Sequence, residues 1–312
     1  MYPRLSDIFK DLFGIQLPFP IYSFGAMVAL AFLAAAWFSR KELDRLFTVG
    51  RLNAVRIPVT VEKGKRKKKT MQEVSPGELM GTITIIAVVA GFIGAKIFHI
   101  LENLGDFARD PLALIFSTGG FTFYGGLIVA AISIAYYVKS KGLDVRTVAD
   151  ALAPGLMISY GIGRIGCQLA GDGDWGIAAN LAAKPSWLPM WLWAESYPNN
   201  ILQINLANNP VYPTSIYEFV ACTLLFVFLW KLRKHPYESG WLFSVYLIVN
   251  GIERFMIELI RVNNRMDLFG LSVTQAEVIA VLLVVAGLIG LSLTWKRREA
   301  ISSAVPATAH AV

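Results

Sequence analysis

The sequence predicts an all-α polytopic membrane protein, with about seven transmembrane helices and a small extracytoplasmic cap. Apolar residues make up 55% of the 312 residues and charged residues only 16%, whereas a soluble domain carries roughly 25% charged residues. Long apolar segments also recur along the chain, each close to the roughly 20 residues that a membrane crossing requires. These observations exclude an ordinary soluble domain.

Seven apolar segments follow one another, and each is long enough to form a transmembrane helix. The first is too long for the apolar core of a signal peptide and is preceded by Asp7 and Asp11, so we expect it to be retained. The predicted spans are Phe19–Phe38, Leu79–Leu101, Phe121–Val138, Val148–Leu169, Tyr212–Trp230, Gly240–Ile260 and Val273–Trp295.

Basic residues predict which connections face the cytoplasm, because Lys and Arg are enriched in cytoplasmic loops. Twenty of the 29 Lys and Arg residues lie in alternate connections, at 40–69, 139–146, 231–234 and 296–298. The opposite connections are poor in basic residues. We therefore expect the N-terminus outside and the C-terminus in the cytoplasm.

We expect a single transmembrane domain over residues 1–300 and a flexible tail at 301–312. Residues 39–76 are predicted to form a basic cytoplasmic loop, and residues 171–211, rich in Trp, Pro and Asn, an extracytoplasmic cap. The basic run Lys63–Lys69 is typical of a loop held near anionic membrane lipid. We therefore predict no nucleic-acid binding.

Neither a disulfide framework nor a metal site is indicated. The two cysteines, Cys167 and Cys222, both lie in apolar segments. The histidines His99, His235 and His310 are far apart in the sequence and form no recognisable metal-ligand cluster.

Four ionisable residues lie inside predicted spans, where a charge is costly and usually functional. They are Lys96, Arg164, Arg254 and Glu258. With a rise of about 1.5 Å per residue and a hydrocarbon core of about 30 Å, all four lie roughly 20 to 27 Å from the cytoplasmic side. We expect them to converge in the outer half of the bilayer.

The sixth span carries a polar stripe. Asn250, Arg254, Glu258 and Arg261 recur at intervals of three or four residues, which places them on one face of a helix. One interpretation is an internal ion pair between Arg254 and Glu258 that only holds the bundle together. Arg164, however, has no carboxylate in its own span. We therefore expect an excess of positive charge that a phospholipid phosphate balances, since arginine suits phosphate oxygens.

Further polar groups lie at the outer ends of other spans. Tyr124, Tyr217 and Glu218 are expected at the level of the arginines, which would make a site open to the outer leaflet. In the turn that follows the fourth span, Asp172 and Asp174 either orient the arginines or are solvated turn residues, and the sequence leaves both possibilities open.

A glycine-rich pattern in the fourth span does not indicate a dinucleotide-binding site. Gly161–Gly166 matches the dinucleotide-binding pattern G-x-G-x-x-G, but that pattern requires a strand, a turn and a helix in a soluble domain. Here it lies inside a membrane span, where glycines allow helices or a lipid headgroup to come close to the backbone.

An ordered set of motifs resembles the prolipoprotein diacylglyceryl transferase family. The order, the spacing and the seven spans agree from about residue 21 to residue 295. The motifs are Phe123–Leu127 (FYGGL), Gly163–Gly166 (GRIG), Gly171–Gly176 (GDGDWG), Tyr212–Glu218 (YPTSIYE), Asn250–Arg261 (NGIERFMIELIR) and Leu271–Gln275 (LSVTQ).

The resemblance implies a reaction and its place. Phosphatidylglycerol would donate its diacylglyceryl group to the lipobox cysteine thiol of a prolipoprotein signal peptide, forming a thioether and releasing glycerol phosphate. The site would face the outer leaflet of a bacterial inner (plasma) membrane, and no metal or soluble cofactor would be used.

The resemblance and the charge pattern together predict the site residues. Arg164 and Arg254 are expected to bind the phosphate, Glu258 to orient them, and Arg261 with the cap to receive the peptide. The predicted catalytic residues are Arg164, Arg254, Glu258 and Tyr124, and the predicted substrate-binding residues are Lys96, Gly125, Gly126, Cys167, Asp172, Tyr217, Glu218, Asn250 and Arg261.

The sequence departs from the family pattern at several positions. Tyr124 and Tyr212 stand where the family usually has His, and Cys167 where it usually has Asn. These changes leave the proton acceptor open. A neutral phenol is a poor general base near pH 7, so we expect Tyr124 to position the donor or the leaving phosphate. The alternative is that Tyr124 is an interfacial anchor.

Two alternatives to a transferase belong to other classes of function. One is a transporter or flippase of an anionic lipid or solute, although such proteins often show internal repeats and broken helices, which are not visible here. The other is a lipid-binding paralogue without turnover.

Overall fold

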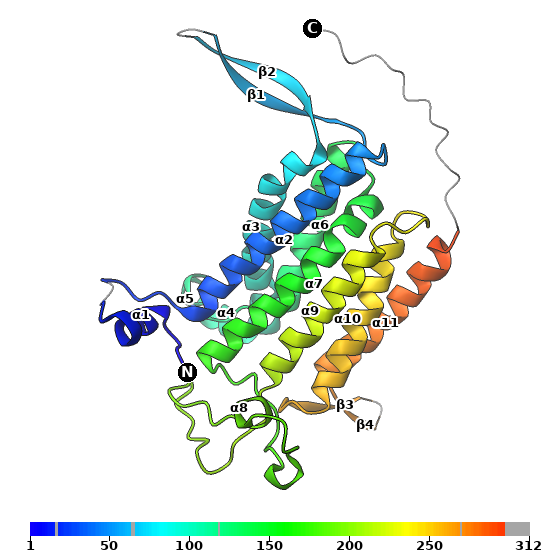
Figure 1. Ribbon diagram of the computed structural model, residues 1–312. Coiled ribbons are helices and arrows are strands. Elements are labelled where there is room, and N and C mark those ends of the chain that lie inside the picture. The colour runs from blue at the N-terminus through cyan, green and yellow to red at the C-terminus, as the bar shows by residue number, and fades with distance from the viewer. Residues whose placement is uncertain (16–17, 64–65, 118, 269, 297–312) are drawn as a thin grey trace.

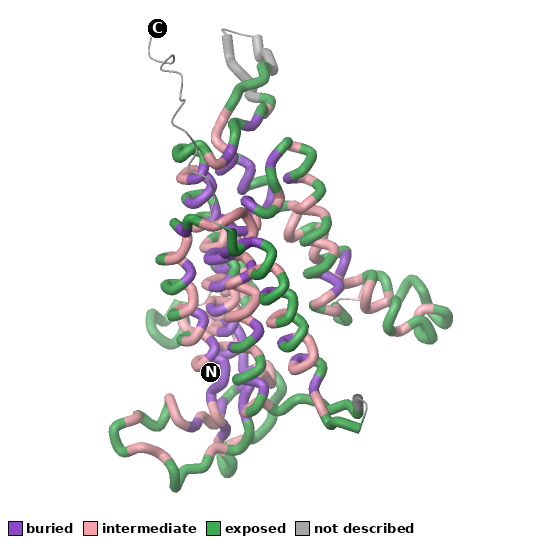
Figure 2. Tube along the Cα trace, turned by 90° about the vertical axis from the view of Figure 1, so that its right-hand side faces the viewer, coloured by how far each residue is buried: buried purple, intermediate pink, exposed green. Residues whose placement is uncertain are grey.

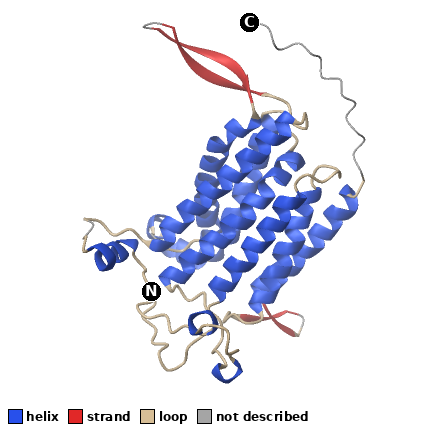
Figure 3. Cartoon of the chain, viewed as in Figure 1, coloured by secondary structure: helices blue, strands red, loops and turns tan. Residues whose placement is uncertain are grey.

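The predicted all-α membrane architecture is confirmed by the computed structural model, which describes residues 1–15, 18–63, 66–117, 119–268 and 270–296. A long helix overlaps each of the seven predicted apolar segments, and α2 extends ten residues beyond its predicted end at Phe38 (Figures 1 and 3). These helices are α2 (Ser23–Thr48), α3 (Met80–Glu102), α6 (Phe123–Ser140), α7 (Val145–Ala170), α9 (Thr214–Leu232), α10 (Trp241–Glu258) and α11 (Gln275–Thr294).

Five of these helices, α2, α3, α6, α9 and α11, are long and apolar enough to cross a membrane. Helices α7 and α10 do not meet that criterion, and each carries charge well inside the helix, Arg164 on α7 and Arg254 on α10. That both of these helices also span the membrane stays a prediction. Both arginines belong to the candidate site described below.

The connections contain short helices and two hairpins of β-strands, which the all-α prediction did not include. Each hairpin is a two-stranded antiparallel sheet, β1 with β2 and β3 with β4. The short elements are α1 (Leu5–Phe13), β1 (Val55–Lys63), β2 (Arg66–Val74), η1 (Pro76–Leu79), α4 (Leu104–Arg109), α5 (Pro111–Phe116), η2 (Leu181–Ala183), α8 (Met190–Trp193), β3 (Arg265–Leu268) and β4 (Leu271–Thr274).

The basic loop predicted at 39–76 is partly regular structure. Helix α2 continues through Thr48, and the hairpin pairs Val55 with Val74 at its base. Alternating β-branched residues in β1, such as Val55 and Ile57, favour a strand. The strong positive charge of this segment predicted a loop, but the alternation of β-branched residues accounts for the strand. Lys65 lies outside the described residues.

The helices alternate in direction, so that the connections gather at two ends of the bundle (Figure 1). The hairpin β1–β2 and the connections after α6 and α9 lie at one end, here called the basic end. The irregular segment 171–213 and the hairpin β3–β4 lie at the other, here called the cap end. The basic residues Arg297 and Arg298 of the tail lie outside the described residues, as does the tail 301–312.

Close helix contacts depend on glycine. A Cβ atom on Gly161 of α7 would lie 2.9 Å from Cys222 of α9, and one on Gly126 of α6 would lie 2.8 Å from the carbonyl oxygen of Gly91 on α3. Only glycine permits backbones this close. Helices α2, α7 and α9 thus pack side by side, whereas α3 and α6 pack mainly on each other.

The interior at the basic end contains a large apolar cluster. This cluster joins the last turns of α2 and α6 to the first turns of α3 and α7, through residues such as Leu43, Val138 and Val148. Large apolar residues also cover the outer faces of the helices, as Figure 2 illustrates with exposed positions along the outside. Such an outward apolar surface suits lipid rather than water.

The cap begins where α7 ends. Gly171 caps α7 with a left-handed backbone, φ 60°, and Gly173 follows with φ 98°, so the chain reverses within a few residues. Buried Trp175, Tyr197 and Val211 form a small core of the cap. This small core holds the turn at Gly171 and Gly173 next to the C-terminal end of α7.

Candidate active site

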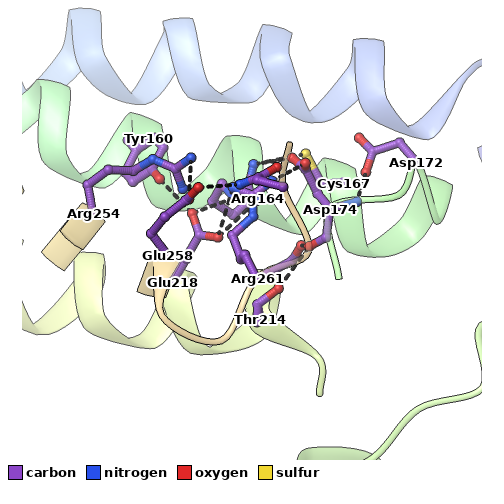
Figure 4. A network of polar contacts seen from close by, with 12 residues as sticks. Tyr160, Arg164, Cys167, Asp172, Asp174, Thr214, Glu218, Arg254, Glu258 and Arg261 are labelled. Atoms are coloured by element: carbon purple, nitrogen blue, oxygen red, sulfur yellow. Dashed lines mark hydrogen bonds and ion pairs between the residues drawn. The ribbon is translucent and has the colours of Figure 1, made fainter. Parts of the chain in front are cut away.

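Arg164 lies at the centre of a buried network between three helices and the cap. Its side chain projects from α7 and only 8% of the residue is exposed. One guanidinium nitrogen, Nη1, donates to Asp174 at 2.5 Å, and the other, Nη2, donates to Glu218 at 2.8 Å (Figure 4). Charge-assisted hydrogen bonds to two carboxylates hold this guanidinium in a fixed orientation.

Glu218 is fully buried on α9 and joins the network from the opposite side. The hydroxyl of Tyr160 donates to its Oε2 at 2.5 Å, and Nη1 of Arg261 lies 3.7 Å from its Oε1. Tyr160 precedes Arg164 by one helical turn, so both side chains lie on the same face of α7. Glu218 was predicted to bind substrate, but its contacts are with the side chains that surround it.

Asp174 binds a second arginine. Nη2 of Arg261 donates to its Oδ1, while Arg164 occupies Oδ2. Its own carbonyl oxygen accepts from the hydroxyls of Thr214 at 2.9 Å and Ser215 at 3.1 Å, which fix the turn against the start of α9. Burial raises the pKa of the Asp174 carboxyl, but Arg164 and Arg261 outweigh burial and hold that pKa below its usual value.

Arg254 and Glu258 form a pair along one face of α10, with 3.0 Å between Nη2 and Oε2. The other Glu258 oxygen accepts from the side-chain amide of Asn263 at 2.6 Å. Nη1 of Arg254 is buried and has no hydrogen-bond partner within the described residues, and the same holds for Nε of Arg261. These nitrogens are donors that an anionic ligand can occupy.

The predicted excess of positive charge is not what the structure contains. Three arginines of the network, Arg164, Arg254 and Arg261, face three partner carboxylates, of Asp174, Glu218 and Glu258. The carboxylates for Arg164 come from α9 and from the cap rather than from its own helix, so a search along one span could not find them. The site offers unoccupied donors rather than a surplus of charge.

Tyr124 faces this network from α6. It is partly buried, and its ring packs edge-on against Phe123 with centroids 5.5 Å apart. The charged groups that act on its hydroxyl are Arg254, Glu258 and Arg261. A phenol thus lies within electrostatic range of the charged residues of α10, at the position where the family usually has His.

Lys96 and the two glycines of the α6 motif lie apart from the arginines. Nζ of Lys96 donates to the backbone oxygens of Ser117 and Gly119 at 3.0 and 3.1 Å, on the connection before α6. Gly125 and Gly126 face α3, where a Cβ on Gly125 would lie 2.3 Å from Phe98. Lys96 thus makes local hydrogen bonds, and the two glycines make packing contacts with α3.

The remaining predicted residues surround the network. The hydroxyl of Tyr217 donates to the carbonyl of Leu192 at 2.7 Å and ties the cap to α9. Asp172 accepts from the backbone N–H of Asp174 at 3.3 Å and so shapes the turn. Asn250 is partly buried on α10, one helical turn before Arg254.

Cys167 lies against Asp172 and Asp174, with one potential ligand atom of each within 4.8 Å of the others. Its sulfur accepts from Nη1 of Arg164 at 3.5 Å. Both oxygens of Asp174 are engaged by arginines. A cation would therefore have to compete with two guanidinium groups for this carboxylate, and the grouping is better described as part of the arginine network.

Sequence reasoning missed two residues of the network and left a third undecided. Tyr160 was missed, although its spacing of four residues from Arg164 was a usable signal. Glu253, buried beside Arg254, was also missed. Asp172 and Asp174 had been considered together, either as residues that orient the arginines or as solvated turn residues, and only Asp172 was among the predicted site residues. It is Asp174 that contacts Arg164 and Arg261.

Comparison with known proteins identifies the family. The family described as prolipoprotein diacylglyceryl transferase matches residues 10–293. Relatives named phosphatidylglycerol–prolipoprotein diacylglyceryl transferase include one from Clostridium tetani, 29% identical over 271 residues that cover 87% of this chain and 91% of the relative. The one from Corynebacterium diphtheriae is 30% identical over 236 residues, covering 70% and 78%. A third, from Vibrio cholerae, is 26% identical over 300 residues, covering 95% of each chain.

These matches extend over nearly the whole chain and favour a transferase over the transporter that was weighed as an alternative. They also agree with the order of motifs from which the resemblance was inferred. The chain belongs to the prolipoprotein diacylglyceryl transferase family and is a multi-pass membrane transferase of that kind.

Proposed function

We propose that this protein transfers the diacylglyceryl group of phosphatidylglycerol to the lipobox cysteine of prolipoproteins. The thiol sulfur attacks the glyceryl carbon that is bonded to the phosphate oxygen. A C–S bond forms as the S–H bond breaks and releases its proton, while the C–O bond breaks and its electron pair leaves with glycerol phosphate. Membership of the family and the names of the relatives support this reaction.

The unoccupied donor of Arg254 is the observation that carries the proposal. Its Nη1 is buried and has no hydrogen-bond partner among the described residues, while Nη2 of the same guanidinium pairs with Glu258. A donor of this kind costs free energy unless a ligand accepts from it. A phosphodiester oxygen is a suitable acceptor, because arginine binds phosphate through directed hydrogen bonds.

The network explains how the leaving group is stabilised. As the C–O bond breaks, negative charge grows on the phosphate, and donors already in place stabilise that charge without reorganising. Arg254 and Arg261 supply the unoccupied donors, Glu258 holds Arg254, and Asp174 holds Arg261 together with Arg164. In this proposal Tyr124 of α6 orients the donor lipid through its hydroxyl.

The cap end faces the outer leaflet of a bacterial inner membrane in this proposal. The enrichment of Lys and Arg at the basic end supports that orientation. Lipobox cysteines of exported prolipoproteins would then meet the site on the side where they emerge. A phosphatase reporter fused after Asn199 should be active, and one fused after Lys68 should be silent. The reverse pattern would overturn the orientation.

The decisive experiment is transfer by the purified protein. Phosphatidylglycerol labelled in its acyl chains should pass label to a lipobox peptide, and a peptide with Ser in place of the lipobox Cys should remain unlabelled. Lipid binding without labelled peptide would identify a paralogue without turnover. Equal transfer from the zwitterionic lipid phosphatidylethanolamine would contradict recognition of an anionic headgroup.

A further inference from the structure

Part of the cap exposes large apolar side chains, although the cap has an apolar core of its own. Residues 181–193, here called the tryptophan lobe, comprise the short helices η2 and α8 and the chain between them. Trp187 is 79% exposed and Trp191 57%, whereas Trp175 in the cap core is 7% exposed. The lobe has one charged residue, Lys184. Large apolar side chains that gather on a surface mark a place of contact with lipid or with another molecule.

The base of the tryptophan lobe is tied to the rest of the cap. Nε1 of Trp193 donates to the carbonyl oxygen of Asn180 at 2.9 Å, which joins the two ends of the lobe. The Trp193 ring also packs edge-on against Tyr212, with centroids 5.5 Å apart. Glu195, just after the lobe, pairs with Val211 of the cap core. A displacement of the lobe would therefore displace the cap core with it.

The tryptophan lobe lies at the level where α9 begins. The hydroxyl of Tyr217 donates to the carbonyl oxygen of Leu192 at 2.7 Å, and Figure 1 shows α8 beside that end of α9. Tyr217 is in the first turn of α9, so a rise of about 1.5 Å per residue places it within about 5 Å of the start of the helix. The 19 residues of α9 span about 28 Å, close to the roughly 30 Å of a hydrocarbon core. The lobe is therefore at the bilayer boundary on the side of the cap end.

The lobe also lies on the side of α9 that faces lipid. Tyr217, Leu224 and Phe228 recur at intervals of seven and four residues, which places them on one face of the helix. Leu224 and Phe228 are exposed, and α9 is long and apolar enough to cross a membrane. Because Tyr217 holds Leu192, the lobe continues the lipid-facing surface of α9 at its outer margin.

The side chains of the lobe suit the boundary between lipid headgroups and acyl chains. An indole combines a large apolar ring with one N–H donor, and tryptophan is enriched at this level of membrane proteins. The ammonium of Lys184 donates to the carbonyl oxygen of Pro185 at 3.0 Å, so its charge is already engaged within the lobe. The contact that the lobe offers is therefore mainly apolar, and its continuity with α9 favours lipid over a protein partner.

We propose that the tryptophan lobe inserts Trp187, Met190 and Trp191 into the lipid interface at the cap end and anchors the cap to the bilayer. The occupant is the region between headgroups and acyl chains, and no lipid charge is required. Through the pairing of Glu195 with Val211, the anchor holds the cap core against the ends of the helices. The inference requires only that the chain spans a membrane, and it does not depend on the proposed transfer reaction.

The test measures the depth of a fluorophore attached to the lobe. Trp187→Cys, labelled with an environment-sensitive nitrobenzoxadiazole group, is placed in phosphatidylcholine vesicles that contain a nitroxide lipid. The nitroxide lies either near the headgroup or near the end of the acyl chain. We expect blue-shifted emission and stronger quenching by the shallow nitroxide than by the deep one. Cys167 and Cys222 are buried, and the wild-type protein treated with the same reagent provides the blank.

Two reference positions calibrate the depth. Leu224→Cys lies about 15 Å along α9 from its start and should be quenched more strongly by the deep nitroxide. Asn208→Cys replaces an exposed polar residue of the cap outside the lobe and should show the emission of a fluorophore in water. Emission typical of water at Trp187→Cys would overturn the proposal. Blue-shifted emission that neither nitroxide quenches would also overturn it, because a protein, such as a second copy of this chain, would then cover the lobe.

A second variant and a second lipid complete the test. If Trp187→Cys does not accumulate as folded protein, Met190→Cys provides the same measurement on the same lobe. Replacing part of the phosphatidylcholine with phosphatidylglycerol should leave the quenching unchanged, because the contact is apolar. Quenching that appears only with the anionic lipid would assign the contact to the charge of Lys184 and would contradict insertion of the tryptophans.

Discussion

At the basic end of the bundle, buried Glu42 binds Arg45 at 2.5 Å and Arg233 at 3.1 Å. Both arginines also donate to backbone carbonyls, Arg45 to that of Arg233 at 3.1 Å and Arg233 to that of Trp230 at 2.5 Å. At the cap end, Arg164, Arg254 and Arg261 bind carboxylates as well, but Nη1 of Arg254 and Nε of Arg261 remain without partners within the described residues.

The difference lies in unoccupied hydrogen-bonding capacity. Arginine–carboxylate pairs occur at both ends, so a buried ion pair alone does not mark a site. At the basic end the pairs tie the end of α9 to α2, as a structural contact would. There, Nε of Arg233 still faces Glu42 at 3.1 Å, and a buried donor without an acceptor among the described residues is the neutral indole of Trp241. Within the described residues, the cap end combines buried guanidinium donors without acceptors and a carboxylate without donors in one network. Unpaired buried groups of this kind are typical of a ligand-binding site.

The largest expected effect is on stability and follows from removing the central cation. Arg164→Ala leaves Glu218 buried without its principal partner and should cost about 3–5 kcal/mol. Glu42→Ala at the basic end should cost less, because Arg45 and Arg233 keep backbone acceptors and are partly exposed. Half-lives of thermal unfolding in detergent compare the two variants. A larger loss in Glu42→Ala would reverse the comparison between the ends.

The second effect is on rate. Arg254→Lys should lower kcat about 10²–10³-fold, because an ammonium cannot reproduce the planar donor set that stabilises the leaving phosphate. Arg233→Lys, at the basic end, should keep near wild-type kcat per folded molecule. Transfer assays on both variants at matched protein levels provide the measurement. Full activity in Arg254→Lys would leave this arginine a structural residue like Arg233.

A smaller effect is expected at Tyr124. If its hydroxyl orients the donor, Tyr124→Phe loses one hydrogen bond, worth about 0.5–1.5 kcal/mol or roughly two- to tenfold in rate. Tyr124→His should remain active. An interfacial anchor would show no change in either variant, and complete loss in Tyr124→Phe would make the phenol an essential acid or base.

The smallest effect concerns acid stability. The pKa of Asp174 is lower in the folded protein than in the unfolded chain, where it is about 3.9. The ionised Asp174 carboxylate therefore stabilises the fold above about pH 3.9, and this stabilisation is lost as the pH falls through the lower pKa of the folded state. Unfolding followed from pH 5 to the acid limit should show a smaller loss on acidification in Asp174→Asn than in the wild type. An identical loss would mean that Arg164 and Arg261 do not act on this carboxyl.

The sequence determined the helices and the two ends of the molecule. Apolar segments of about 20 residues specify helices whether or not their neighbours are known, because each satisfies its backbone hydrogen bonds internally. The alternation of basic residues likewise separates the two ends before any packing is considered. The spacing of Arg254, Glu258 and Arg261 predicted a polar stripe, and Arg254 and Glu258 do pair along α10.

Only the tertiary structure decided which charges meet. Asp174 rather than Asp172 binds the arginines because the left-handed turn at Gly171 and Gly173 directs it towards them. Lys96 is held by Ser117 and Gly119 instead. These outcomes depend on the rotation of each helix about its axis and on the path of the cap. Residue spacing within a single helix predicts neither of them. Glu253 lies beside Arg254 in the sequence, and only packing against α7 and α9 leaves it buried and unpaired.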